Sequence, residues 1–250
     1  MGTSTSSKGA NKKSSLVPSW ANDNNEPVPN IERDLGGFRA ELGRAASGQT
    51  GNHLERAVGH YAKNATGGRL VGPKRYQTII KAGGRLFDLL QNIQEGNTYL
   101  TLSLAELNGQ PTDIVIDKII EVLLEVNGDS EIIRASLNQS LSECLEDIEE
   151  FDATCISDDF IVDLMIGYTK QFLFQQIMLD SRASFDKADT LEKQFELEQD
   201  LYALIQSSVD RHMGRQLRES QNRLNHNDIE CIQRLALEEI WAEWEDFLND

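Results

Sequence analysis

The sequence contains little of what disulfide-bonded or metal-held proteins are built from. Only three of its 250 residues are cysteine and four are histidine. Cys144, Cys155 and Cys231 are odd in number, widely spaced and outside any C-x-x-C pair, which argues against a disulfide scaffold and a zinc site. The histidines show no H-E-x-x-H or other ligand spacing. The sequence therefore predicts reduced thiols in a cytoplasmic protein, with no metal and no cofactor.

Long apolar runs are also missing. No stretch of about 18 apolar residues occurs, and the richest one, residues 114–126, is interrupted by charged side chains. No apolar segment of the kind found in secretory signals precedes Trp20. We therefore expect neither a membrane-spanning segment nor an export signal.

Catalytic motifs are absent as well. The stretch from Gly67 to Lys74 comes nearest to a phosphate-binding loop, but Pro73 and Arg75 stand where such a loop requires other residues. There is no G-x-S-x-G elbow. Carboxylates are abundant, yet they lie on the polar faces of expected helices with no sign of desolvation. We predict no catalytic residue and no enzymatic activity.

What the sequence does contain is helical periodicity. From Ile31 nearly to the end, apolar residues recur every three or four positions. Alternation typical of a strand is limited to residues 98–104. The fold class predicted is all-α, a multi-helix bundle preceded by a disordered N-terminal tail. We divide the chain into a tail (1–30), a basic helical segment (31–95) and an acidic helical domain (96–250).

Capping and breaking residues predict several helix boundaries. Asn30 is expected to cap a helix ending at Ala46, and Ser157 is expected to start a later one. Gly83-Gly84 is a kink or a point of close packing. The strongly apolar helix over residues 114–126 is expected to sit centrally.

The first twenty residues, MGTSTSSKGANKKSSLVPSW, have two parts. The Ser, Thr, Gly and Lys tract cannot bury enough apolar surface to fold, whereas the Leu-Val-Pro-x-Trp that follows is a short apolar anchor. Anchors of this kind dock into grooves of other proteins. We expect Leu16, Val17, Pro18 and Trp20 to bind a partner; the alternative is an ordinary floppy terminus. Met1-Gly2 followed by Ser6 also fits the N-myristoylation pattern.

Charge is distributed unevenly along the chain. Residues 1–87 hold 13 Lys and Arg against 6 Asp and Glu, a balance of +7, while residues 88–250 hold 11 against 35, a balance of −24. Residues 56–87 contain seven basic residues and no acidic one. Such a stretch binds nucleic acid or another polyanion, docks on a protein, packs on the acidic part of its own chain, or is simply a solvated face.

A protein-docking role is the interpretation we favour for this basic stretch. Single-strand binders alternate cationic groups with aromatic stacking platforms, and only Tyr61 and Tyr76 occur here. Nucleic acid is therefore not expected as a partner. Lys74 and Arg75 are assigned to the docking surface.

Three stretches resemble one known family. They are Met1-Gly2-Thr3-Ser4 with the Leu16–Trp20 anchor, the run AVGHYAKNATGGR over residues 57–69, and LNGQP at 107–111 followed by DKIIEVLL at 117–124. This pattern is similar to the QatB family of the bacterial Qat anti-phage defence system. The resemblance covers roughly residues 1–150. The tail departs from the family's usual glycine- and proline-rich one at Lys12-Lys13-Ser14-Ser15.

The resemblance implies a non-enzymatic defence component that acts as an adaptor. Its implied partners are a QueC-like enzyme (QatC), an ATPase (QatA) and a TatD-like nuclease (QatD), with no membrane contact. It further implies that Gly2, exposed once Met1 is removed, is joined through its α-amine to a deazaguanine. A helical adaptor that reaches nucleic acid or membrane through its basic N-terminal third is the alternative. In the second stretch, the expected partner-binding residues are His60, Tyr61, Gly67, Gly68 and Arg69.

Overall fold

The computed structural model describes residues 15–22, 32–220 and 224–249. Every regular element in these ranges is helical, and β-pairing is limited to isolated bridges between Tyr99 and Leu102 and between Pro111 and Glu150. The all-α prediction is confirmed. The segment over residues 98–104 forms no strand, because the chain turns back on itself at Leu100 (φ 52°).

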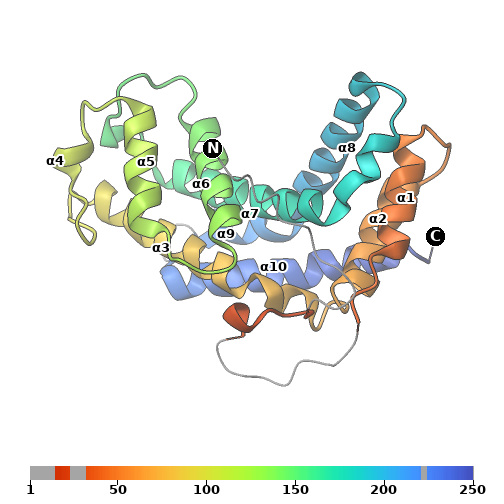
Figure 1. Ribbon diagram of the computed structural model, residues 1–250. Helices are drawn as coiled ribbons and strands as arrows, with labels where there is room; N and C mark the ends of the chain where they lie inside the picture. Colours follow the sequence, from red (N-terminus) through yellow and green to blue (C-terminus); the bar gives the residue numbers. More distant parts are fainter. Residues whose placement is uncertain (1–14, 23–31, 221–223, 250) are drawn as a thin grey trace.

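Three long helices form the base of the molecule (Figure 1): α3 (Gln77–Gln94), α7 (Asp158–Ser181) and α10 (His226–Asp246). Helix α3 packs against both α10 and α7. Two arms rise from this base on the same side (Figure 1). One arm contains α4 (Leu104–Leu107), α5 (Thr112–Leu123) and α6 (Ser130–Cys144), and the other contains α1 (Gly36–Ala46), α2 (His53–His60) and α8 (Leu191–Val209). The short helix α9 (Arg215–Ser220) lies beside α7.

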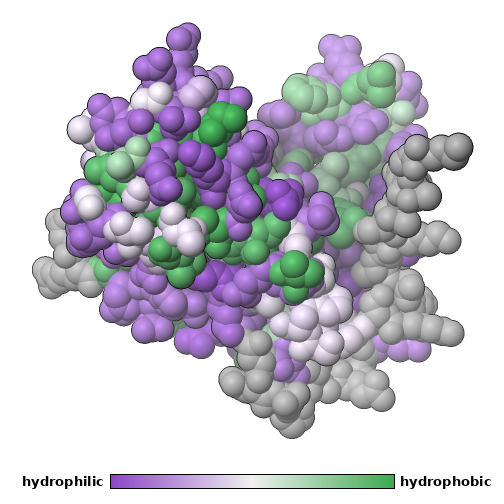
Figure 2. All heavy atoms as spheres, turned by 60° about the vertical axis from the view of Figure 1, so that its left-hand side comes forward, coloured by the Kyte–Doolittle hydropathy of each residue, from purple (hydrophilic) through white to green (hydrophobic). Residues whose placement is uncertain are grey.

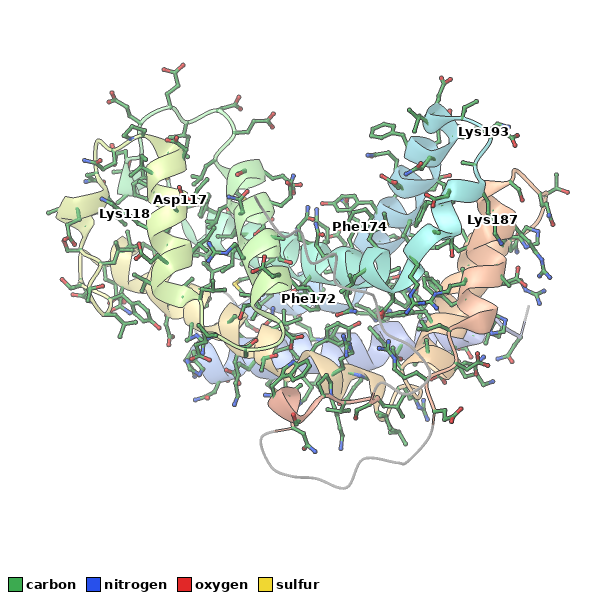
Figure 3. All side chains as sticks on the ribbon, in the orientation of Figure 1. Asp117, Lys118, Phe172, Phe174, Lys187 and Lys193 are labelled. Atoms are coloured by element: carbon green, nitrogen blue, oxygen red, sulfur yellow. The ribbon has the colours of Figure 1, made fainter. Side chains whose placement is uncertain are left out.

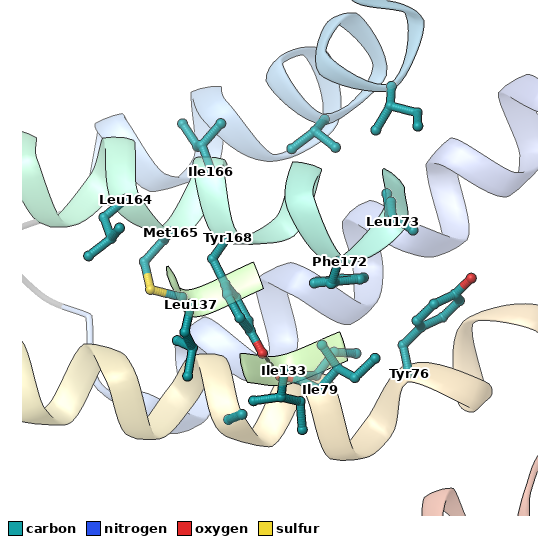
Figure 4. Packing of buried hydrophobic residues seen from close by; sticks show 14 of the residues in the cluster. Tyr76, Ile79, Ile133, Leu137, Leu164, Met165, Ile166, Tyr168, Phe172 and Leu173 are labelled. Carbon is teal, nitrogen blue, oxygen red and sulfur yellow. Dashed lines mark hydrogen bonds between the residues drawn. The ribbon is translucent and has the colours of Figure 1, made fainter. Parts of the chain in front are cut away.

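The core is centred on α7, where Tyr168 and Phe172 point down onto α3 and α6 residues (Figure 4). Tyr168 is fully buried, and its hydroxyl donates a hydrogen bond to the carbonyl oxygen of Ile79 at 2.9 Å. Burial raises the pKa of Tyr168 above its ordinary value, so the hydroxyl stays protonated and keeps donating. Ile133 and Leu137 of α6 fill the space beside it. One hydrophobic cluster thus runs through both the 31–95 and the 96–250 segments.

Helix starts follow local chemistry where a capping side chain is present. Ser157 accepts a hydrogen bond from the Phe160 amide at 3.1 Å, which confirms it as the cap of α7. Asn225 caps α10 in a reciprocal capping box with Asp228. Helix α1 begins at Gly36, so the expected start at Asn30, which lies outside the described residues, was wrong.

Two further expectations about helices have opposite outcomes. Gly83 and Gly84 are confirmed as a close-packing point, since methyl groups there would lie 2.7 Å from Gln233 and 3.0 Å from Glu230 of α10. The apolar helix over 114–126 was wrongly placed at the centre. Helix α5 lies in an arm, ends at Leu123, and leaves Val126 fully exposed. Its charged residues at every third or fourth position give it one buried face and one solvated face.

Candidate functional site

The candidate site is built on the glycine turn that follows α2. Helix α2 continues into a π-helical turn, Tyr61–Ala65, and the chain then reverses through Gly67 and Gly68. Their φ angles are +86° and +82°, in the left-handed region that side chains rarely adopt. The Gly68 amide donates to the Ala62 carbonyl at 2.9 Å and closes the turn. The residue type at both positions is therefore dictated by the backbone.

Helix α10 holds this turn from the C-terminal end of the chain. The Trp241 indole N–H donates to Thr66 Oγ1 at 2.7 Å, in a fully buried position. The Glu245 carboxylate accepts a hydrogen bond from the Arg69 amide at 2.7 Å. A methyl group on Gly72 would lie 2.2 Å from the Trp241 ring nitrogen. The turn and α10 thus fit together without room for an additional atom.

The N-terminal anchor lies on this turn, beneath α3 and on the side away from the arms (Figure 1). Leu16 and Val17 are 2% and 4% exposed. A methyl group on Gly67 would lie 2.9 Å from Leu16 Cδ1. The absence of a side chain at Gly67 therefore leaves the space that Leu16 occupies, which we call the seat of the anchor. The following 3-10 turn, Ser19–Ala21, packs against α3 and the 3-10 turn Gly72–Tyr76. The anchor therefore docks within its own chain.

This arrangement corrects part of the expected partner surface. Leu16, Val17 and Pro18 are buried on the protein itself, because their apolar side chains find a groove made by the glycine turn. Trp20 is different: it lies over Gly128, where a methyl group would be 2.3 Å from its ring, and it remains 44% exposed. Trp20 is the one residue of the predicted set in the anchor that presents a large apolar surface to solvent.

A buried polar cluster of Arg33, Asp180, Tyr61 and Tyr76 lies next to the turn. Arg33 and Asp180, which are 1% and 0% exposed, form an ion pair of 2.9 Å. Tyr61 donates to the same Asp180 oxygen at 3.0 Å, and its hydroxyl lies 3.3 Å from that of Tyr76. Burial, with the nearby Tyr76 and Asp180, raises the pKa of Tyr61 well above its ordinary value, and burial raises the pKa of Tyr76 to about 12. Both phenols are therefore protonated donors at neutral pH.

The remaining predicted site residues separate into inner and outer positions. Tyr61 is fully buried, so its expected contact with a partner is replaced by internal packing against Phe38 and Trp241. Arg75 turns inward, and its guanidinium donates to Gln176 at 2.9 Å. In contrast, the side chains of Arg69 and Lys74 are exposed.

His60 stands apart from the glycine turn. Its Nδ1 lies 2.9 Å from the Asn64 side-chain amide, and its ring covers Gly37 of α1. The structure thus brings Gly67, Gly68 and Arg69 together with Leu16, and places His60 at the contact between α1 and α2. Gly2 lies outside the described residues.

Sequence reasoning missed the C-terminal half of this site. Trp241 and Glu245 were not among the expected residues, because no motif or resemblance pointed to the last helix. The signal available was a second apolar row on the same helix, Leu237 and Trp241, at the i, i+4 spacing of a buried face. A helix with two such rows is buried on a wide face and contacts more than one neighbour.

Much of the basic stretch is engaged within the chain. Arg56 lies 3.9 Å from Glu41, and Arg85 lies 2.6 Å from Glu125. With Arg75 directed at Gln176, at least three of the seven cations expected to face a partner have internal contacts. The stretch is therefore less positive at its surface than its composition suggests.

Histidines pair with carboxylates in the described part of the chain. His53 contacts Glu41 at 2.7 Å, His212 contacts Glu243 at 2.6 Å and His226 contacts Asp88 at 2.8 Å. Among the described residues, no group of three or more His, Cys, Asp or Glu is arranged to hold a metal ion. The three cysteines are free thiols. No helix within these ranges has both the length and the apolar character that a bilayer crossing demands.

The comparisons with known proteins identify a family. A family model described as "Qat anti-phage system associated protein QatB" matches residues 67–243. The match begins at the first glycine of the turn and ends in α10, so it includes Gly67, Gly68 and Trp241 of the site. No curated protein and no solved structure matched the chain. Because the matched region covers well over half of its length, the chain belongs to the QatB family of proteins associated with the Qat anti-phage system.

Proposed function

We propose that the protein is a non-enzymatic adaptor of its defence system that presents its own N-terminus for modification. In this proposal a QueC-like partner, QatC, joins a deazaguanine to the α-amine of Gly2. The observation that carries the proposal is the internal anchor. Leu16 and Val17 are held on the glycine turn by burial, so the residues that precede them are tethered at a defined place on the protein.

The tether limits where the partner can stand. Thirteen residues, 3–15, separate Gly2 from Leu16. The chain from Gly2 to Leu16 spans at most about 50 Å when fully extended. The active site of the modifying enzyme must therefore come within about 50 Å of Leu16. Two exposed residues near Leu16 suit a docking surface within that range. They are Trp20 at the end of the anchor and Arg69 on the glycine turn.

The chemistry suits an N-terminal glycine. An α-amine has a pKa of about 8, so a fraction is neutral and nucleophilic at neutral pH, unlike a lysine amine. The amine nitrogen attacks the carbonyl carbon of an acyl-adenylate made from ATP and the deazaguanine carboxylate. An amide bond forms, AMP leaves and the amine loses a proton. Glycine has no side chain to obstruct this attack.

Peptide mass spectrometry tests the proposal. The full chain is purified with active QatC and, as the control, with a catalytically inactive QatC. The Gly2 peptide is expected to gain the deazaguanine mass only with the active enzyme. An unmodified N-terminus under conditions in which the system protects against phage contradicts the proposal.

The contribution of the anchor is tested separately. Leu16→Asp with Val17→Asp places charges in an apolar seat and is expected to release the segment. Val126→Asp with Leu235→Asp makes the same kind of change at exposed apolar residues elsewhere and serves as the control. Release removes the high effective concentration of Gly2 near the partner, so modification is expected to slow at least tenfold. Equal rates for the two double variants would show that the anchor has no part in presentation.

Binding of nucleic acid or membrane through the basic third is the second candidate. The internal contacts of Arg56, Arg75 and Arg85 argue against it, because they remove charge from the expected footprint. The isolated protein is accordingly expected not to shift DNA or RNA at physiological salt.

A further inference from the structure

The outer arm exposes an apolar face on α8 that the site described above does not use. Leu191 and Phe195 are 83% and 61% exposed, although both are large apolar residues. They lie one helical turn apart, so their side chains are neighbours on one side of α8. Figure 2 shows hydrophobic side chains gathered near the top of this arm, across an open space from the other arm.

The face continues down the helix to the base of the molecule. Tyr202 lies on the same side of α8, within about 20° of Leu191 on an ideal helix. Its ring meets Phe174 of α7 edge-on, with 5.4 Å between centroids. Phe174 lies on the upper side of α7, between the arms, whereas Phe172 points to the opposite side and into the core (Figure 3). Leu191, Phe195, Tyr202 and Phe174 thus lie along one side of this arm, and we call these four residues the α8 strip.

Acidic residues border and interrupt the strip. Glu192 and Glu196 follow Leu191 and Phe195 by one position each and therefore lie about 100° further round the helix, and Glu198 falls between Phe195 and Tyr202. The one cation in α8, Lys193, is paired with Asp189 at 2.9 Å. Within the part of the chain that the structure describes, no ion pair joins Glu192, Glu196 or Asp200 to a cation. At the other end of the strip, Lys170 of α7 lies over the Tyr202 ring, 5.3 Å from its centroid. The surroundings of Leu191 and Phe195 therefore have a net negative charge, whereas a cation covers the Tyr202 end.

From this combination we propose that the α8 strip is the docking surface for a basic amphipathic helix of a partner protein. Apolar side chains on one face of that helix cover Leu191 and Phe195, and its Lys or Arg residues meet Glu192, Glu196 and Glu198. A second copy of this chain is a poorer occupant, because Arg56, Arg75 and Arg85 of its basic stretch are engaged internally. The inference rests on the adaptor half of the proposed function and is independent of modification at Gly2.

Two exposed apolar anchors, Leu191 and Phe195, suit a specific but modest contact. An interface built on one helix face typically depends on a few apolar anchors, and truncating one of them commonly costs tenfold or more in affinity. Charges at the rim act mainly on the association rate and on salt dependence. Binding is therefore expected to weaken as salt rises, while the loss of Leu191 and Phe195 removes it at any salt concentration.

Two assays with the full-length protein test the α8 strip. In the first, a fluorescent amphipathic peptide of Leu and Lys is titrated with the protein, and a peptide with the same Leu positions but Glu in place of Lys is the control probe. In the second, the protein is co-expressed with the other components of its defence system and the complex is purified. The variant is Leu191→Ser with Phe195→Ser. Its matched control is Val126→Ser with Leu235→Ser, which removes exposed apolar residues elsewhere.

The wild type and the control variant are expected to bind the Lys peptide, and the strip variant is expected to bind it at least tenfold more weakly and to lose a component of the complex. Glu192→Lys with Glu196→Lys is also expected to weaken binding of the Lys peptide. Equal binding and an intact complex for the strip variant would overturn the proposal, as would a concentration-dependent dimer that disappears only in that variant. If the wild type co-purifies with no component, the adaptor role fails, and the peptide titration still decides the α8 strip.

Discussion

The buried polar cluster and the α8 strip make opposite use of charge. In the cluster, Arg33 from the basic segment meets Asp180 from the acidic part of the chain, and both are removed from solvent. In the strip, carboxylates of the acidic part remain in water beside exposed apolar side chains. The comparison shows that the sign of charge in a sequence segment does not tell whether the segment faces inward or outward. Here, part of the basic segment serves the fold, and carboxylates of α8 remain at the surface.

The two regions therefore differ in what a substitution should change. A substitution in the cluster leaves a buried charge without its partner and acts on the free energy of unfolding. A substitution on the strip acts on binding and leaves the fold unchanged, since the side chains are already hydrated. The predictions that follow test this division, starting with the largest effect on stability.

Asp180→Ala is expected to destabilise the protein most. It leaves the Arg33 guanidinium buried and removes the acceptor of the Tyr61 hydroxyl, so the free energy of unfolding should fall by about 3–5 kcal/mol. Urea unfolding followed by circular dichroism measures the change. Asp189→Ala, which removes an exposed partner of Lys193, is the control and should leave the urea midpoint unchanged. Similar midpoints for both variants would show that the buried cluster does not stabilise the fold.

Gly59→Ala is expected to lower the free energy of unfolding by about 1–3 kcal/mol, because the added methyl group pushes α2 away from α10. A methyl group there would lie 2.8 Å from the Trp244 carbonyl oxygen of α10, and backbone cannot give way as a flexible side chain can. Gly167→Ala in α7 is the matched control, since its methyl group would lie at an ordinary 3.6 Å from Ser140. That control should be neutral or stabilise by up to about 1 kcal/mol, through the higher helix propensity of alanine. Thermal unfolding of both variants separates close packing from a general intolerance of alanine.

Glu41→Gln is expected to have a smaller effect that depends on pH. Burial raises the pKa of Glu41, but its hydrogen bond with His53 and the charges of Arg44 and Arg56 outweigh burial and hold the pKa below the ordinary value of 4.5. A depressed pKa contributes stability above the unfolded-state pKa, and this contribution is lost as the pH falls through the folded-state pKa. The Tm of the variant should lie below that of the wild type at pH 7, and the gap should shrink below pH 4.5. A gap that is constant from pH 7 to pH 3 would contradict the assignment.

Leu191→Ser with Phe195→Ser should change stability least. Exposed positions away from caps and buried contacts usually change the free energy of unfolding by no more than about 0.5 kcal/mol. The double variant is therefore expected to melt within a few degrees of the wild type while losing affinity for the basic peptide. A large fall in its Tm would place these residues in the fold and remove the contrast between the two regions.

Local features of the fold were predictable from the sequence because they depend on neighbouring residues. Ser157 caps α7 through an amide three positions away, and the apolar stripe of α6 follows from helical spacing alone. Two adjacent glycines, Gly67 and Gly68, favour a chain reversal, and the chain turns there. Each of these features lies within one or two turns of chain.

The candidate site was less predictable because its contacts span long distances in the sequence. Arg33 and Asp180 are 147 residues apart, and Trp241 reaches Thr66 across 175 residues. No periodicity reports such pairings. The same reason explains why Leu16 and Val17 were assigned to a partner: an apolar anchor looks the same whether its groove belongs to another protein or to residues far along its own chain. Composition predicted the anchor, and only the three-dimensional structure supplied the groove.

The dependence of the glycine turn on α10 has a consequence for how the protein is made. The anchor leaves the ribosome early, but Trp241 and Glu245, which hold its seat, are added more than two hundred residues later. At the roughly 5–20 residues per second of translation, the N-terminal segment therefore spends at least ten seconds without a completed seat. The position of Leu16 is therefore set only when α10 folds. Truncated chains that end before residue 241 should accordingly leave Leu16 open to proteases, and the released full-length chain should protect it.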